Sequence, residues 1–159
     1  MKDIFLRQAT LTDYNRFKEL RDDSEKSIVY GWYEKYVYTG NKPTEDVQVI
    51  ENLVNETNET IFKDYNENVK NTFFIMVDGQ ISGYITTNRK KGERQIIDIV
   101  IDDYSIINEL YLSKIFYNLF EITKSRLISL YSYTQRLKRM LLRIGFFEKS
   151  GCLQKESYR

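Results

Sequence analysis

Residues 72–88 read TFFIMVDGQISGYITTN, and the fold follows from this stretch more than from any other. Two runs rich in apolar, β-branched and aromatic residues, 72–77 and 80–88, flank an Asp-Gly pair. Asp-Gly is a preferred pair in the tight turns that join antiparallel strands, so the stretch predicts a β-hairpin. Gly83 lies inside the second run and predicts a bulge or the close approach of another backbone.

The residues that follow alternate between strand and helix signals. A polar turn at 89–94 leads to QIIDIVI at 95–101, which predicts a third antiparallel strand. Residues 108–124 predict an amphipathic helix, because apolar side chains recur there at helical spacing: Leu112, Ile115, Phe116, Leu119 and Ile122. RLISLYSY at 126–133 predicts another strand.

A last helix is predicted to begin at Thr134, a residue type that caps helices. Gly145 follows its final apolar residue, at the position where a left-handed residue often ends a helix. Phe146 and Phe147 come next, and we expect them to begin one final strand that runs toward Tyr158 along the sheet edge.

Upstream of the hairpin, residues 3–9 alternate as a short strand. Thr12 is expected to cap a helix that ends near Asp22, and residues 45–66 carry apolar side chains at mostly helical spacing. The complete order predicts one domain over residues 1–159. Its class is α/β, with a central mixed sheet and helices on both faces.

The composition excludes several classes of site. The 159 residues contain no histidine, which excludes histidine triads and most zinc sites, and no metal is expected. Cys152 is the only cysteine, so no internal disulfide forms, and we expect a reducing, cytoplasmic setting. No apolar run is long enough to span a membrane, and charged residues interrupt the start of the chain, so no export signal is expected. Acid–base chemistry is left to Asp, Glu, Tyr, Lys, a chain terminus or water.

The charge is unevenly distributed along the chain. Residues 124–159 hold nine Lys or Arg against two acids, while the rest of the chain is net acidic. One interpretation is a solvated basic helix face, and another is a site for a phosphate-bearing ligand. Nucleic acid is the weaker prediction, because the last helix has no interleaved aromatic residues and the whole chain is near neutral.

The order of elements resembles the GNAT superfamily of acetyl-CoA-dependent N-acetyltransferases over essentially the whole chain. Within it, the sequence is most similar to small bacterial proteins related to the ribosomal-protein alanine N-acetyltransferases. Four stretches carry the resemblance: IFLRQATLTDYNRF for the opening strand and helix, FFIMVDGQISGYI for the central hairpin, VIDDYS after the cofactor strand, and LLRIGFFEKSG near the end.

The resemblance implies a mostly antiparallel mixed sheet and acetyl transfer to a primary amine of a small molecule or peptide. Two parallel strands, at 97–101 and 127–131, would splay apart and hold the pantetheine arm of acetyl-CoA. The pyrophosphate would lie on backbone N–H groups at the start of the next helix, where the helix dipole favours an anion. The implied cofactor contacts are Ile99, Val100, Ile101, Ser105, Ile106, Ile107, Asn108, Glu109, Leu110 and Thr134.

The sequence departs from the family pattern at the expected pyrophosphate turn. Ser105 stands at the usual basic position, and Asn108 and Leu110 stand where the family has two glycines. Leu141 stands where the family often has a tyrosine that protonates the leaving thiolate. These departures favour an alternative interpretation, a catalytically inactive binding module with the same fold that has lost acetyl-CoA binding.

Candidate catalytic residues come from the strand region. Asp98 interrupts an apolar strand and is a candidate base. Alternatively, it lies at the rim of an exposed sheet face or makes a satisfied internal hydrogen bond. Glu93 is a second candidate base, with a plain turn position as its alternative. Tyr131 and Tyr133 end the second splayed strand and are candidate proton donors, although most tyrosines serve packing.

The acceptor would lie between the first two helices if the resemblance holds. Tyr30, Trp32 and Tyr33 cluster there, and an aromatic wall suits an amine through cation–π contacts. Helix packing is the alternative for this cluster. The ending GCLQKESYR leaves an exposed edge strand that would allow a homodimer.

Overall fold

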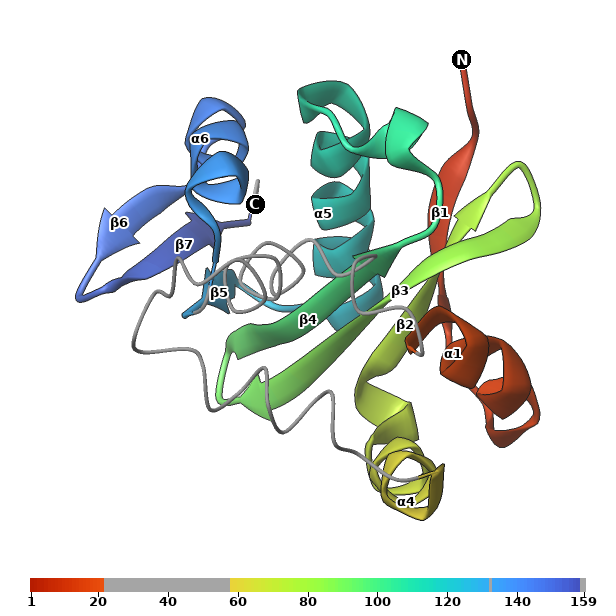
Figure 1. Ribbon diagram of the computed structural model, residues 1–159. Helices are drawn as coiled ribbons and strands as arrows, with labels where there is room; N and C mark the ends of the chain where they lie inside the picture. The colour runs from red at the N-terminus through yellow and green to blue at the C-terminus, as the bar shows by residue number, and fades with distance from the viewer. Residues whose placement is uncertain (22–57, 132, 158–159) are drawn as a thin grey trace, which may run out of the picture.

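The computed structural model describes residues 1–21, 58–131 and 133–157 (Figure 1). At its centre is a seven-stranded sheet in the order β1-β2-β3-β4-β5-β7-β6. Neighbouring strands are antiparallel except for β4 and β5, which run parallel, and this confirms the predicted mixed, mostly antiparallel sheet. The strands are β1 (Ile4–Gln8), β2 (Thr72–Val77), β3 (Gln80–Lys90), β4 (Glu93–Ile101), β5 (Leu127–Leu130), β6 (Phe147–Lys149) and β7 (Cys152–Glu156).

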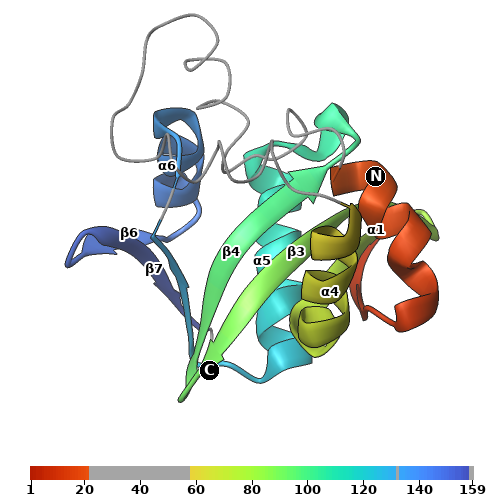
Figure 2. The same ribbon diagram turned by 60° about the horizontal axis from the view of Figure 1, so that its bottom comes forward.

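Helices cover both faces of the sheet, as predicted (Figures 1 and 2). On one face, α5 (Glu109–Thr123) and α6 (Gln135–Arg143) pack over one apolar core. On the other face, α1 (Tyr14–Arg21) and α4 (Asn58–Asn68) pack over a second, smaller core. Within the described ranges, three short 3-10 turns join these elements: η1 (Leu11–Asp13), η3 (Val69–Asn71) and η4 (Tyr104–Ile106). The part of the predicted 45–66 helix before Asn58 lies outside the described residues.

The central hairpin has both features predicted from Gly83. Gly83 pairs with Ile75 while Ile81 pairs with Met76, so Ser82 is the extra residue of a bulge. A Cβ atom on Gly83 would lie 2.2 Å from the carbonyl oxygen of Val100 on β4. Glycine is therefore required for β3 and β4 to approach this closely.

The end of α6 also forms as predicted. Gly145 adopts a left-handed φ of 105°, the Phe146 N–H donates to the Leu141 carbonyl at 3.0 Å, and the Gly145 N–H donates to the Leu142 carbonyl at 3.4 Å. These two bonds make a Schellman motif, which satisfies the last helical carbonyls and turns the chain back toward the sheet. Phe146 then enters the core, 5.0 Å from the ring of Phe116.

Several predicted boundaries and positions are wrong. The strand predicted at 126–133 ends at Leu130, and the single final strand is instead a β6–β7 hairpin that turns at Ser150 and Gly151. The N-cap of the first helical turn is Thr10 rather than Thr12. Ile122 is 38% exposed, whereas Phe120 is buried in the core.

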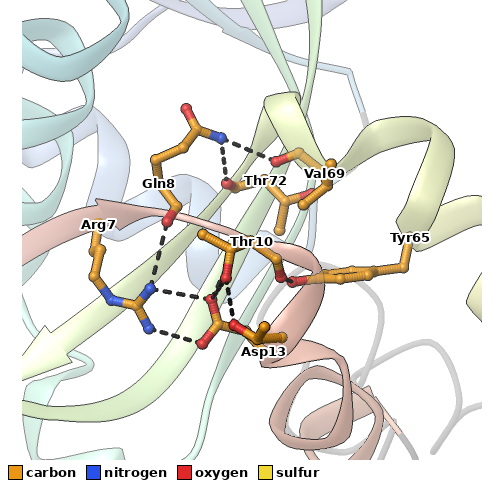
Figure 3. A network of polar contacts seen from close by, with 8 residues as sticks. Arg7, Gln8, Thr10, Asp13, Tyr65, Val69 and Thr72 are labelled. Carbon is orange, nitrogen blue, oxygen red and sulfur yellow. Dashed lines mark hydrogen bonds and ion pairs between the residues drawn. The ribbon is translucent and has the colours of Figure 1, made fainter.

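A polar network joins β1, η1 and α4 (Figure 3). Arg7 donates two hydrogen bonds to the Asp13 carboxylate, at 3.0 and 3.1 Å. Asp13 also accepts from the backbone N–H and the hydroxyl of Thr10, and the Tyr65 hydroxyl donates to the Thr10 carbonyl. The network fixes the chain between β1 and α1, and burial raises the pKa of Tyr65 to about 12.

We expect Asp13→Asn to lower the free energy of unfolding by about 1–2 kcal/mol at pH 7, because an ion pair and a helix cap are lost together. The Arg7 guanidinium, followed by Thr10, lowers the pKa of Asp13 in the folded chain. The stabilisation is therefore present above the unfolded pKa of about 3.9 and is lost as the pH falls through the lower folded value. Urea unfolding between pH 7 and pH 2 tests this, with Glu67→Gln at an exposed position of α4 as the matched control. If the free energies of unfolding of Asp13→Asn and the native chain differ by the same amount at every pH, the prediction is wrong.

Candidate functional site

The parallel strands β4 and β5 separate part-way along β4. Their ladder runs from Glu93 opposite Leu127 to Ile96 opposite Leu130, where β5 ends. β4 continues to Ile101 without a neighbour on that side among the described residues (Figure 1). The two strands therefore form the edges of a wedge that opens beyond Ile96.

The backbone of β4 presents polar groups to this wedge. The Asp102 N–H donates to the Ser82 carbonyl, so alternate residues before it bond to β3 as well. By this alternation Val100 bonds toward β3, whereas Ile99 and Ile101 turn their N–H and C=O groups toward the wedge. Of the three strand residues predicted to touch the cofactor, Ile99 and Ile101 have backbone groups that face the wedge.

Asp98 lies at the edge of the wedge, next to a second bulge. Thr86 pairs with Asp98 while Thr87 pairs with Ile96, so Ile97 is the extra residue. Asp98 is only 4% exposed, which excludes the interpretation as a rim residue. Its carboxylate accepts from the Ile99 N–H at 2.8 Å, so it holds one of the backbone donors that face the wedge.

A hollow of about 290 Å³ lies on the same face of the sheet as Asp98, under α1 and α4. Thr86, which pairs with Asp98, and Ile97, which precedes it, both line the hollow. Hydroxyl and amide groups dominate its remaining polar wall, and its charged lining residues are one arginine and one aspartate. The other lining residues are Phe17, Arg21, Ile61, Asp64, Tyr65, Asn68, Thr72, Thr87 and Asn88.

The start of α5 is capped by a side chain. The side-chain oxygen of Asn108 accepts from the Tyr111 N–H at 3.0 Å, and its side-chain amide donates to the Ser105 carbonyl. Asn108 is therefore the N-cap of α5. Leu110 is 51% exposed and does not fill the wedge. Ile106 is buried in the core and Ile107 packs against it, so their side chains hold the loop in place.

Each acid close to the start of α5 has a cation beside it. Arg16 lies 3.2 Å from Asp102, and Lys2 lies 2.7 Å from Asp103. The first residue of α5, Glu109, is 3.0 Å from Arg143 on α6. Lys2, followed by Ser105, lowers the pKa of Asp103 to about 2. These pairs offset the negative charge that the sequence places at this end of the sheet.

The remaining predicted catalytic residues divide between two places. Glu93 is the first residue of β4 rather than part of a turn, and Ser129 donates a short hydrogen bond to its carboxylate. Tyr131 lies just past the end of β5 and is 46% exposed. Tyr133 packs against the core under α5 and α6. The hydroxyl of Thr134 accepts from the Leu137 N–H and caps α6, as predicted.

The family resemblance also concerns Leu141 and the predicted acceptor contacts. Leu141 is fully buried in the core, so this position offers no proton donor. Tyr30, Trp32 and Tyr33, the predicted acceptor contacts, lie outside the described residues. Within the described residues no three His, Cys, Asp or Glu side chains group as a metal site, and no helix is both long and apolar enough to cross a membrane.

Sequence reasoning missed several residues at this site. Ser129 is the main one, because its link to Glu93 depends on the parallel register of β4 and β5. Lys2 and Arg16 were missed too, since each pairs with an acid more than eighty positions away. Only alternation along β5, which places Ser129 on the face opposite buried Ile128, offered a signal.

The sequence matches no protein-family model and no curated protein sequence. Solved structures match over nearly the whole chain. An acetyltransferase of the GNAT family from Streptococcus agalactiae is 11% identical, with a TM-score of 0.65 over 98% of this chain and 96% of its own. The chain has the GNAT fold.

Two further structures with this fold contain coenzyme A. An aminoglycoside acetyltransferase in complex with coenzyme A and kanamycin is 13% identical, with a TM-score of 0.63 over 97% of this chain and 95% of its own. The ribosomal-protein acetyltransferase RimL, in complex with coenzyme A, is 12% identical, with a TM-score of 0.61 over 97% and 94%. The GNAT fold predicted from the sequence is therefore confirmed.

Proposed function

We propose that this protein is an acetyl-CoA-dependent N-acetyltransferase that acts on a primary amine of a small molecule or peptide, in the cytoplasm. The observation that carries the proposal is the wedge, in which β4 extends past β5 and turns the backbone of Ile99 and Ile101 outward. An extended amide-containing arm can add to such a strand edge through main-chain hydrogen bonds. The GNAT-fold structures with bound coenzyme A support the same assignment.

The start of α5 fits the pyrophosphate of the co-substrate without the family glycines. Asn108 takes the Tyr111 N–H, and no acceptor among the described residues takes the N–H groups of Glu109 and Leu110. Backbone donors at a helix start, together with the helix dipole, favour an anion there. Arg143 lies beside Glu109 and offsets its negative charge at the same end. A phosphate would therefore meet backbone donors and a charge-balanced loop rather than a net acidic one.

The hollow beside Asp98 is the proposed acceptor site. It opens on the face of the sheet where Asp98 and Thr86 lie, and its hydroxyl and amide walls suit a polar amine. The amine must lose a proton before it attacks, and Asp98 would accept that proton directly or through water. The acetyl group itself comes from the bound thioester. Ile99 would then donate its N–H to the thioester carbonyl once Asp98 releases it.

A binding module without catalysis is the second candidate. It is favoured by the burial of Leu141, which leaves no hydroxyl where the family often has a tyrosine. It is also favoured by the Asn108 cap, which uses one of the helix-start donors.

Two measurements on the purified chain separate the candidates. Thermal melting with acetyl-CoA should shift upward, because a ligand that binds only the native state stabilises it by RT ln(1 + [L]/Kd). Release of free coenzyme A thiol is then followed with a panel of primary amines and N-terminal peptides. A melting shift with thiol release supports the enzyme. No shift at millimolar acetyl-CoA would contradict the enzyme and support the binding module, which has lost acetyl-CoA binding.

A further inference from the structure

We propose that Lys2, in the segment before β1, is a positioning residue for acetyl-CoA, because it holds the loop between β4 and α5 in the form that receives the pyrophosphate. The inference rests on the proposed function, in which the pyrophosphate lies on the first backbone N–H groups of α5. Lys2 would act through the loop and would touch none of the reacting atoms.

The side chain and the backbone of Lys2 bond to two different parts of the loop region. Its ammonium donates to the Asp103 carboxylate at 2.7 Å and also to the Ser105 hydroxyl. Its backbone N–H donates to the hydroxyl of Tyr111, in the first turn of α5, at 3.1 Å. Lys2 therefore holds the loop both soon after β4 and at the start of the helix.

Hydrogen bonds within the loop connect these two contacts into a closed circuit. The Asp103 carboxylate accepts from the Ser105 N–H at 2.9 Å and from the Ser105 hydroxyl at 2.6 Å. The Ser105 carbonyl accepts from the Asn108 side chain, whose oxygen accepts from the Tyr111 N–H, each at 3.0 Å. The Tyr111 hydroxyl then leads back to Lys2. Every residue of the circuit is bonded to at least two others, so the path of the loop is fixed.

The segment that carries Lys2 is itself fixed to the sheet. The Asp3 N–H donates to the Asp78 carboxylate, and the Asp78 N–H donates to the Asp3 carbonyl, both at 2.9 Å. The next residue, Ile4, is buried and pairs with Val77 of β2. Lys2 therefore holds the loop from a rigid support. A loop that is ordered before its ligand arrives loses less conformational entropy on binding.

The circuit surrounds the proposed phosphate donors and leaves them available. Glu109 and Leu110 lie between Asn108 and Tyr111, and no acceptor among the described residues takes their N–H groups. Both residues that flank this pair belong to the circuit. The circuit therefore sets the direction of the two N–H groups that would meet the pyrophosphate.

The Lys2–Asp103 pair contributes little to the stability of the fold as a whole. The two side chains are 36% and 35% exposed, and ion pairs at such exposure stabilise a protein only slightly. A substitution of Lys2 is therefore expected to release the loop while the rest of the chain stays folded.

Lys2→Met removes the ammonium and keeps a long, unbranched side chain. In the acetyl-transfer assay, with the fastest-reacting amine of the panel, it should raise KM for acetyl-CoA about fivefold to tenfold and leave kcat within about twofold, because binding must then order the loop. The acetyl thioester of pantetheine has no pyrophosphate, so its KM should be the same for the variant and the native chain. Lys63→Met, at an exposed position of α4, is the matched control and should change neither KM.

Tyr111→Phe opens the same circuit without a change of charge. It removes the hydroxyl that accepts from the Lys2 N–H and keeps the aromatic ring. It should also raise KM for acetyl-CoA and leave KM for the acetyl thioester of pantetheine unchanged. If only Lys2→Met has this effect, Lys2 acts through its charge and the positioning role is wrong.

The remaining outcomes separate the inference from the proposed function. A native chain that transfers no acetyl group from acetyl-CoA overturns both together. If the native chain is active and Lys2→Met has the same KM for acetyl-CoA as Lys63→Met, the inference alone is overturned. An equal rise in KM for the two thioesters also overturns it alone, because Lys2 would then affect the site generally rather than through the pyrophosphate.

Discussion

Asp98→Asn should lower kcat/KM for acetyl transfer at least a hundredfold, while the chain stays folded and still binds acetyl-CoA. The expected loss is the usual contribution of a positioned general base. Asparagine has nearly the shape of aspartate, and its carbonyl oxygen can still accept from the Ile99 N–H, which lies 2.8 Å from the native carboxylate. The substitution therefore removes the ability to take a proton and keeps the local hydrogen bond. Steady-state rates and melting curves with acetyl-CoA measure the two effects separately.

The matched control is Asp102→Asn, four residues further along and beyond the end of β4. Asp102 is exposed and pairs with Arg16, and such surface pairs contribute about 0–1 kcal/mol to stability. Asp102→Asn should change kcat/KM less than threefold. Equal losses in the two variants would show that Asp98 acts only through local charge, and full activity in Asp98→Asn would remove it from the chemistry.

Gly83→Ala should give the largest loss of stability of any single methyl added to the sheet, about 3 kcal/mol or more by analogy with overpacked cores. The new Cβ would lie 2.2 Å from the Val100 carbonyl oxygen and 3.2 Å from the Ile101 Cα. Both are backbone atoms, so no side chain can rotate away to relieve the contact. Strands β3 and β4 would have to separate, and the segment of β4 that lines the wedge would move with them. Urea unfolding gives the size of the loss.

Gly79→Asn provides the comparison within the same hairpin. Gly79 has a φ of 82°, and nothing lies within 4 Å of its added Cβ. Asparagine is the residue that best tolerates this left-handed region after glycine, so the cost should stay near 1 kcal/mol. If the two variants lose the same free energy, the cause is glycine's general backbone freedom rather than the contact with Val100.

The sequence predicted correctly the features that depend on residues close together along the chain. The Asp-Gly turn, the bulge at Gly83 and the Schellman motif at Gly145 each depend on a few neighbouring residues and their allowed backbone angles. The apolar spacing of α5 and α6 likewise follows from helix geometry alone. These elements, in this order, were sufficient to predict the mixed sheet and the fold.

The parts that the sequence did not reveal depend on distant pairings. The last strand is a hairpin, and the Ser150-Gly151 pair was a local turn signal that the prediction did not use. The position of β7 between β5 and β6 depends on distant pairing and could not be predicted locally. The link from Ser129 to Glu93 depends on the parallel register. The ion pair between Lys2 and Asp103 joins residues about a hundred positions apart, so no local pattern predicts it.

Hydrogen exchange of the backbone amides in β4, with and without acetyl-CoA, tests the central claim most directly. If the arm of the co-substrate pairs with the edge of β4, the amide of Ile101 should exchange at least tenfold more slowly when it is bound. The amides of Ile99, which Asp98 already holds, and of Val100, which already bonds to β3, should change less and serve as internal references. Unchanged exchange at Ile101 under conditions where acetyl-CoA raises the melting temperature would contradict the account, because the ligand would then bind elsewhere.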